Sequence, residues 1–263
     1  MQDWRTYDDV AEDYERIHAP RMAEPARDLV AVAGIRRGDR VRDIGTGTGV
    51  AARAAAAAGA TVVGVDHSIG MLRTARRNRP DVRAVGAEAI DLPFRQGTFD
   101  VVIGSFVIAH FTKVDTALFD LLRVLRPGGQ LALTAWGDAE DELARTWREL
   151  AESVVPPSIL GPAMSERLPG RDRFRDRETM AQTLMDAGLR NVRTEIRRYR
   201  FRYSLDEYVD GLTTWAMGRF LRSMLGDRGF DSFVGRARET FAEQFADPVN
   251  DFREVVFGVG TKS

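Results

Sequence analysis

Residues 41–49 read Val-Arg-Asp-Ile-Gly-Thr-Gly-Thr-Gly and lead through Val50 into the alanine-rich run Ala51 to Ala58. A strand that ends in a glycine turn and continues straight into a helix presents backbone N–H groups and the positive end of a helix dipole to a ligand. Glycines also allow positive φ angles and close approach of a ligand to the backbone. The stretch predicts a nucleotide-type binding turn, with an ordinary glycine turn as the alternative.

The spacing of the glycines separates two kinds of ligand. The dinucleotide fingerprint would place its third glycine at residue 50, which is Val, whereas this chain has Gly45, Gly47 and Gly49. Asp43, just before the turn, would repel a phosphate and attract an ammonium group. The pattern therefore favours a ligand with a cationic end over a pyrophosphate.

A second acidic residue follows the next strand. Thr61 to Val65 is short and apolar, as expected for a buried parallel strand, and Asp66 lies at its tip. A carboxylate about twenty residues beyond such a turn can accept hydrogen bonds from both ribose hydroxyls. Asp66 could instead cap the next helix, but Ser68 is already placed to do so. This feature indicates a nucleoside without identifying the cofactor.

Strand patterns over residues 81–85, 97–104 and 130–136 alternate with helical patterns, which predicts a doubly wound α/β sheet. With the glycine turn, the segment Gly64 to Leu72, the Leu-Pro-Phe ending at Phe94 and Arg126-Pro-Gly-Gly129, the chain resembles the class I S-adenosylmethionine (SAM) dependent methyltransferases over residues 36–136. The resemblance is to their small-molecule branch. It implies a Rossmann-like sheet of order 3-2-1-4-5-7-6 with strand 7 antiparallel, and a helical substrate lid.

The resemblance also implies SAM as cofactor and methyl transfer to O, N or C of a small, apolar or aromatic molecule. It assigns cofactor contacts to Asp43, Gly45, Thr46, Gly47, Asp66, His67, Met71, Glu88, Ala89, Ser105 and Tyr14. Counting back from Pro93 gives the adenine-binding acid as Glu88, with Asp91 as the alternative. His67 and Met71 could instead be packing residues.

The fourth strand ends in the expected reaction zone, because ligands of open α/β sheets bind outside the carboxyl ends of the strands. His110 emerges there, and an ordinary histidine pKa of about 6.5 suits a general base. A histidine that only makes a structural hydrogen bond is the alternative. Substrate contacts are predicted for Tyr7, Phe106, Trp136 and Trp215, although such aromatic residues are also common in plain cores.

The predicted organisation is one methyltransferase domain over residues 1–263. It comprises an N-terminal helical cover (1–35), a SAM-binding core (36–137) and lid insertions (138–180 and 204–247). The prolines over residues 156–169 predict an irregular segment. Ser204 to Glu207 is a capping box that opens a helix reaching Phe220, and a second helix is expected over residues 231–245. Strands are expected over residues 190–203 and 251–260.

Composition limits the function further. The 263 residues are 44% hydrophobic with a net charge of −1, so no nucleic-acid or membrane partner is indicated. The arginines over residues 190–203 are interspersed with other side chains and are expected on a partly exposed strand. The absence of cysteine excludes disulfides and thiolate sites, and three histidines make a metal site unexpected. A polar start and no long apolar stretch predict a cytoplasmic protein. A small-molecule substrate is the expected partner, and a homodimer is the oligomeric state to test.

Three other functions remain open at this point. An NAD-linked oxidoreductase would share Asp66 and the glycines, although Asp43 and Val50 count against it. A SAM-binding enzyme that catalyses cyclisation or decarboxylation would have the same residues over 41–136. A binding module with a degenerate site is the third, and the set Gly45, Gly47, Asp66 and Glu88 argues against it.

Overall fold

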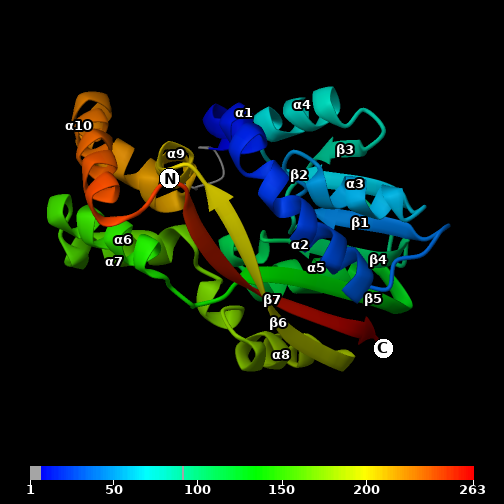
Figure 1. The fold of residues 1–263 in the computed structure, drawn as a ribbon. Coiled ribbons are helices and arrows are strands. Elements are labelled where there is room, and N and C mark those ends of the chain that lie inside the picture. The colour runs from blue at the N-terminus through cyan, green and yellow to red at the C-terminus, as the bar shows by residue number, and fades with distance from the viewer. Residues whose placement is uncertain (1–6, 91) are drawn as a thin grey trace. The chain divides into compact units, whose positions relative to one another are not determined.

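A computed structural model describes residues 7–90 and 92–263 (Figure 1). Asp91, the alternative adenine-binding acid, lies outside the described residues. The strands are β1 (Arg40–Ile44), β2 (Thr61–Asp66), β3 (Arg83–Gly86), β4 (Phe99–Ser105), β5 (Leu125–Trp136), β6 (Leu189–Tyr203) and β7 (Val249–Lys262).

These strands form one sheet with the order β3-β2-β1-β4-β5-β7-β6. The pairs β1–β2, β1–β4, β2–β3 and β4–β5 are parallel, and β5–β7 is antiparallel. The predicted strand order and the reversed seventh strand are confirmed. Because β1 and β4 are neighbours while the chain passes from β1 to β2, the strand order reverses at the carboxyl ends of β1 and β4, where such folds bind ligands.

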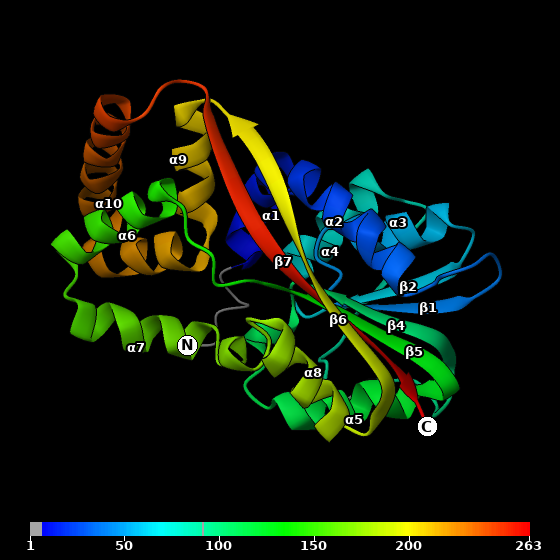
Figure 2. The same ribbon diagram turned by 60° about the horizontal axis from the view of Figure 1, so that its bottom comes forward.

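Helices and strands alternate along the chain from β1 to β3. The helices are α1 (Tyr7–Ile17), α2 (Ala19–Val32), α3 (Val50–Ala57), α4 (Ile69–Asn78), α5 (Val114–Val124), α6 (Glu142–Val154), α7 (Pro157–Arg167), α8 (Arg177–Asp186), α9 (Leu205–Thr214) and α10 (Ala216–Gln244), with short 3-10 turns η2 (Ile108–His110) and η3 (Arg171–Arg173). Figure 2 shows α2 and α3 on one face of the sheet and α5 and α8 on the other.

The chain divides into two compact units. The sheet unit consists of the described residues up to 138 together with 168–197 and 254–263, and the helical unit consists of 139–167 and 198–253. The helical unit has a core of its own, in which Trp147 of α6 meets Phe233 of α10 edge-on with ring centroids 5.1 Å apart.

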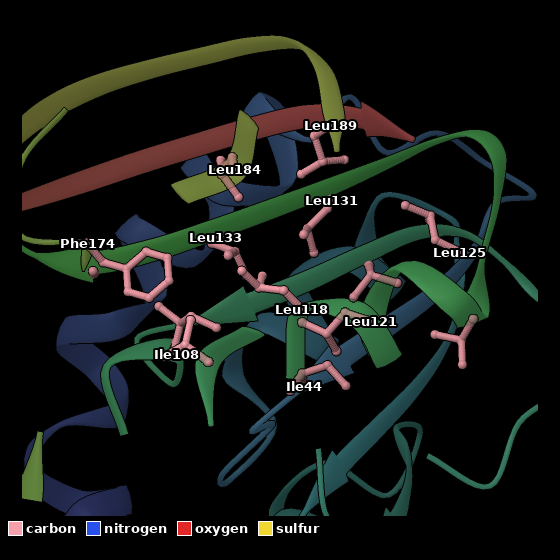
Figure 3. Packing of buried hydrophobic residues seen from close by; sticks show 14 of the residues in the cluster. Ile44, Ile108, Leu118, Leu121, Leu125, Leu131, Leu133, Phe174, Leu184 and Leu189 are labelled. Carbon is pink, nitrogen blue, oxygen red and sulfur yellow. The ribbon is translucent and has the colours of Figure 1, made fainter. Parts of the chain in front are cut away.

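The core of the sheet unit lies between the sheet and its α5 and α8 face. Leu118 and Leu121 of α5 are at most 1% exposed, and they pack with Leu131 and Leu133 of β5 and with Leu184 of α8 (Figure 3). Burying large aliphatic side chains contributes roughly 1.5–3 kcal/mol each. Ile44 of β1 and Val102 of β4 belong to the same cluster, so this layer supports the two strands that carry the predicted site.

The proline-rich segment after α6 is not irregular as predicted. Residues 157–167 form α7, which begins at Pro157 and contains Pro162. A proline fits the first helical turn, where its missing N–H would have no intrahelical partner. Leu160 is buried in the core of the helical unit, so packing stabilises the helix despite Pro162.

Two boundaries also differ from the prediction. The strand predicted over residues 130–136 begins earlier, because β5 already pairs at Leu125, and Arg126 to Gly129 bulge out before pairing resumes at Gln130. The helix opened by Ser204 ends at Thr214, and the next begins at Ala216 rather than near residue 231. Gly226, at a φ of 66°, kinks that helix where the sequence suggested a gap.

Within residues 7–90 and 92–263, no helix combines the length and the apolar character needed to span a membrane.

Candidate active site

The glycine turn follows β1 directly. Gly45, Gly47 and Gly49 have φ angles of 60°, 54° and 89°, a left-handed conformation that other residues rarely adopt. A side chain at Gly45 would collide with Val107, whereas a Cβ at Gly47 would meet no protein atom within 4 Å among the described residues. The turn is therefore closed toward β4 and open beside Gly47.

Asp43 lies fully buried beneath this turn. Its Oδ2 accepts a hydrogen bond from Thr46 Oγ1 at 2.7 Å, while its Oδ1 is buried without a hydrogen-bond partner in the described part of the chain. Burial is the main cause that raises the Asp43 pKa to about 7. An unsatisfied buried oxygen is costly. A cationic group of a ligand would satisfy this oxygen, which agrees with the sequence prediction that Asp43 attracts an ammonium group.

Asp66 holds the turn from the tip of β2. Its Oδ2 accepts the Gly47 N–H at 2.8 Å and its Oδ1 accepts the Ser68 N–H at 2.9 Å. Burial raises the pKa of Asp66, and these hydrogen bonds oppose the rise. A carboxylate has about four acceptor positions, so capacity remains for ribose hydroxyls. The prediction that Ser68 caps the next helix is confirmed, because its hydroxyl accepts the Met71 N–H.

The predicted adenine residues lie around the tips of β2 and β3. His67 Nδ1 is 3.6 Å from Glu88 Oε1, and both side chains are partly exposed. Ala89 is half-buried in the same loop as Glu88. Met71, by contrast, is a buried residue of α4 and is 3% exposed. The structure thus brings His67 and Glu88 together, and Met71 contributes to the core.

The end of β4 carries the predicted reaction zone. Ser105 ends the strand half-buried, and Phe106 follows with a φ of 58°, an uncommon conformation for a residue with a side chain. The Phe106 N–H donates to the Thr134 carbonyl and hydroxyl oxygens at 3.2 and 3.1 Å. Its ring stacks on Trp136 at the tip of β5, with centroids 4.1 Å apart. Two of the predicted substrate residues therefore form one aromatic pair.

A row of rings connects this zone to the N-terminal helix. The centroids of His110 and Tyr7 are 5.9 Å apart, those of Tyr7 and Tyr14 are 6.2 Å apart, and those of Tyr14 and His18 are 5.1 Å apart. Three of these residues were singled out from the sequence. Trp215, by contrast, lies between α9 and α10 in the helical unit.

Sequence reasoning missed two features of the site. Asp8 on α1 accepts hydrogen bonds from Ser68 and Gly70, and its spacing with Glu12 and Glu15 on one face of α1 was the available signal. Arg42, in the strand that precedes the glycine turn, was assigned no role from the sequence. It is fully buried with its guanidinium 4.0 Å from the centroid of Phe94, and burial lowers its pKa to about 9.

The side chains and the open turn at this site fit SAM better than a metal ion. The free Asp43 oxygen suits the amino group of a methionine moiety, Asp66 suits a ribose, and the opening at Gly47 leaves room for close approach. In the described part of the chain, no group of three or more His, Cys, Asp or Glu side chains is placed to hold a metal ion.

Comparisons with known proteins agree with this geometry. A family model described as a methyltransferase domain matches residues 42–133. The demethylmenaquinone methyltransferase of Renibacterium salmoninarum is 31% identical over 196 residues, which cover 71% of this chain and 83% of that protein.

Two solved structures share the fold. A SAM-dependent methyltransferase of Thermotoga maritima has 19% identity and a TM-score of 0.59, with 99% of this chain and 100% of that chain covered. A phosphoethanolamine N-methyltransferase of Haemonchus contortus, solved with S-adenosylhomocysteine (SAH), has 18% identity and a TM-score of 0.59 and covers 100% of this chain and 60% of its own. From its site and its relatives, the chain belongs to the class I SAM-dependent methyltransferases that act on small molecules.

Proposed function

We propose that the methyl acceptor is a hydroxylated aromatic ring of the quinol type. The observation that carries the proposal is the stacked pair of Phe106 and Trp136 at the carboxyl ends of β4 and β5. A flat aromatic surface in a reaction zone favours a flat aromatic ligand. The name of the Renibacterium relative, which refers to a demethylated menaquinone, supports the same class.

In this proposal the cofactor residues are those predicted from the sequence. Asp43 and Thr46 hold the amino-acid end beside Gly45 and Gly47, and Asp66 holds the ribose. Glu88, with His67 beside it, takes the adenine amino group, and Ala89 lines the adenine ring. Met71, which is buried in α4, stays a predicted contact. Ser105 and Tyr14 border the methionine end. When bound, SAM supplies an electrophilic methyl group on a sulfonium.

The protein's own task is then alignment, water exclusion and acceptance of one proton. We assign the role of proton acceptor to His110, whose ring lies against Tyr7 in the reaction zone. A quinol hydroxyl that loses its proton to His110 becomes a stronger nucleophile at oxygen and at the adjacent ring carbons. Tyr7, Phe106 and Trp136 are the acceptor contacts in this proposal. Trp215 belongs to the helical unit, and its contribution to the choice of acceptor stays a prediction.

The acceptor class is tested by a panel of candidate substrates. A naphthoquinol without its ring methyl group, a simple phenol and an aliphatic amine are each incubated with the protein and SAM, and SAH formation is followed. We expect turnover with the naphthoquinol above the other two. Turnover with the amine alone would contradict the proposal.

The role of His110 is tested with His110→Gln. General base catalysis contributes about 10²–10⁴-fold, so kcat should fall by about 10²-fold or more while SAH affinity is retained. An unchanged kcat would remove His110 from the mechanism.

A cytoplasmic location, a homodimer and the lack of a nucleic-acid partner remain part of the proposal, and size-exclusion chromatography tests the dimer.

A further inference from the structure

Helix α1 packs against α4, the helix that follows the ribose-binding strand β2, as the neighbouring ribbons of α1 and α4 show in Figure 1. We propose that Asp8 of α1 is a positioning residue for the cofactor, which acts through Ser68 on the carboxylate of Asp66. The inference rests on the proposed role of Asp66 as the ribose ligand.

The first step is the contact between Asp8 and the start of α4. Asp8 Oδ1 accepts hydrogen bonds from Ser68 Oγ and from the Gly70 N–H, both at 2.7 Å. A carboxylate at a helix N-terminus is stabilised by the helix dipole and by the N–H groups that lack intrahelical partners. The hydrogen bonds from Ser68 and Gly70 lower the pKa of Asp8, so the carboxylate stays charged across the neutral range.

The second step runs from Ser68 to the site. Ser68 is 1% exposed, its hydroxyl accepts the Met71 N–H at 3.1 Å, and its own N–H donates to Asp66 Oδ1 at 2.9 Å. Asp66 in turn accepts the Gly47 N–H of the glycine turn. One continuous set of hydrogen bonds therefore runs from α1 to the open side of the turn.

Gly70 shows that this close approach depends on a particular residue. A Cβ at Gly70 would lie 2.6 Å from the Asp8 carbonyl oxygen and 2.8 Å from the Asp8 Cα, distances that real Cβ atoms essentially never show. Its φ is not in the left-handed region, so the requirement for glycine comes from the packing of α1. Any larger residue would push α1 away from α4.

A second link joins α1 to the glycine turn independently. Arg79 Nη1 lies 2.9 Å from both carboxylate oxygens of Glu15 and donates to the Thr48 carbonyl at 2.8 Å. The side chains of Arg79 and Glu15 are 13% and 20% exposed. Helix α1 is thus tied at both ends to loops that the cofactor is proposed to contact, and it carries Tyr7 and Tyr14 with it.

The experiment measures SAH affinity by calorimetric titration for the wild type, Asp8→Ala, Asp8→Asn and Asp9→Ala. Asp9 is exposed and belongs to the same turn of α1, so its removal matches the change in charge. We expect about a tenfold loss for Asp8→Ala, as for a charge-assisted hydrogen bond, and less than twofold for Asp9→Ala. Asp8→Asn keeps an oxygen that can accept both hydrogen bonds and should recover most of the affinity.

A double-mutant cycle with Asp66→Ala tests the route. If Asp8 acts through Asp66, Asp8→Ala should cost less than about twofold in the Asp66→Ala background. A full tenfold loss in both backgrounds would overturn the route, and equal losses for Asp8→Ala and Asp9→Ala would reduce the effect to general charge. At saturating SAM, Asp8→Ala should keep its kcat while its KM for SAM rises.

The SAH affinity of Asp66→Ala, together with amide hydrogen exchange in Asp8→Ala, separates failure of this inference from failure of the ribose assignment. If Asp66→Ala leaves SAH affinity unchanged, the ribose assignment is wrong and the proposal falls with it. If Asp66→Ala weakens binding but Asp8→Ala changes neither SAH affinity nor exchange over residues 7–17, only the role of Asp8 is wrong.

Discussion

At the scale of single residues, Asp43 gives a prediction about pH. Burial raises its pKa to about 7, so the carboxylate of the ligand-free protein is ionised at about pH 8 and protonated at about pH 6. Only the ionised form attracts an ammonium group. The Kd for SAH should therefore rise as the pH falls below about 7, by up to about tenfold per pH unit.

Titration calorimetry at several pH values measures this dependence. Asp43→Asn is the matched variant, because it keeps the shape without the charge, and its weaker binding should vary little with pH. The same shift makes the contribution of Asp43 to the stability of the ligand-free protein fall as the pH rises between about 4 and 7, since the folded state holds its proton longer. A wild-type Kd for SAH that does not change with pH would count against the role of Asp43.

Phe106 gives a second prediction at this scale. Phe106→Ala removes one ring of the stacked pair, a contact of about 0.5–1.5 kcal/mol beyond its buried area. We expect a several-fold higher KM for an aromatic acceptor with SAH affinity unchanged, in steady-state kinetics and calorimetry. Phe119→Ala is the control, because Phe119 is 71% exposed on α5. Equal KM values for wild type and Phe106→Ala would remove Phe106 from the acceptor site.

Residues with a fixed spacing could be predicted from the sequence, and residues with distant partners could not. Asp43 and Asp66 stand at set distances from the glycine turn, and the structure places both against it. Asp8 meets Ser68 across sixty positions of the chain, so the local pattern of acidic residues on α1 marks Asp8 but does not identify its partner. Arg42 sits in a buried strand because the rings of Phe94 and Phe99 cover it, which only the fold brings about.

At the scale of elements, the capping box of α9 gives a prediction about stability. The Ser204 hydroxyl accepts the Glu207 N–H and the Glu207 carboxylate accepts the Ser204 N–H. Ser204→Ala should lower the free energy of unfolding by about 1 kcal/mol, the usual loss for such a cap, as measured by urea denaturation.

Ser232→Ala in α10 is the control for this prediction. Ser232 is exposed, and its hydroxyl donates to the Arg228 carbonyl of its own helix, so little stability should change. SAH affinity should be unaffected in both variants. A loss for Ser204→Ala no larger than for Ser232→Ala would mean that the cap contributes nothing to folding.

Local rules explain which elements could be predicted. The cap at Ser204 and the buried strand at residues 61–66 follow from neighbouring residues and were found. The helix over residues 157–167 contradicts its prolines because the buried Leu160 packs it into the core of the helical unit. The kink at Gly226 joins two helical stretches that the sequence pattern separates.

At the scale of the whole molecule, the strand order came from the resemblance and not from the pattern of strands and helices. Alternation predicts a parallel sheet but leaves the order of its strands open. The antiparallel pairing of β5 with β7 depends on contacts more than a hundred positions apart, such as Leu133 with Gly258. No local rule reaches that far.

The central claim is that this chain transfers a methyl group from SAM to an aromatic small molecule. The most direct measurement incubates the protein with SAM and a demethylated naphthoquinol and quantifies SAH and product together by mass spectrometry. Our account predicts equal amounts of SAH and of a product heavier by one methylene unit, with both lost in Asp66→Ala at limiting SAM. Consumption of the quinol to a product of unchanged mass, with no SAH formed, would contradict it.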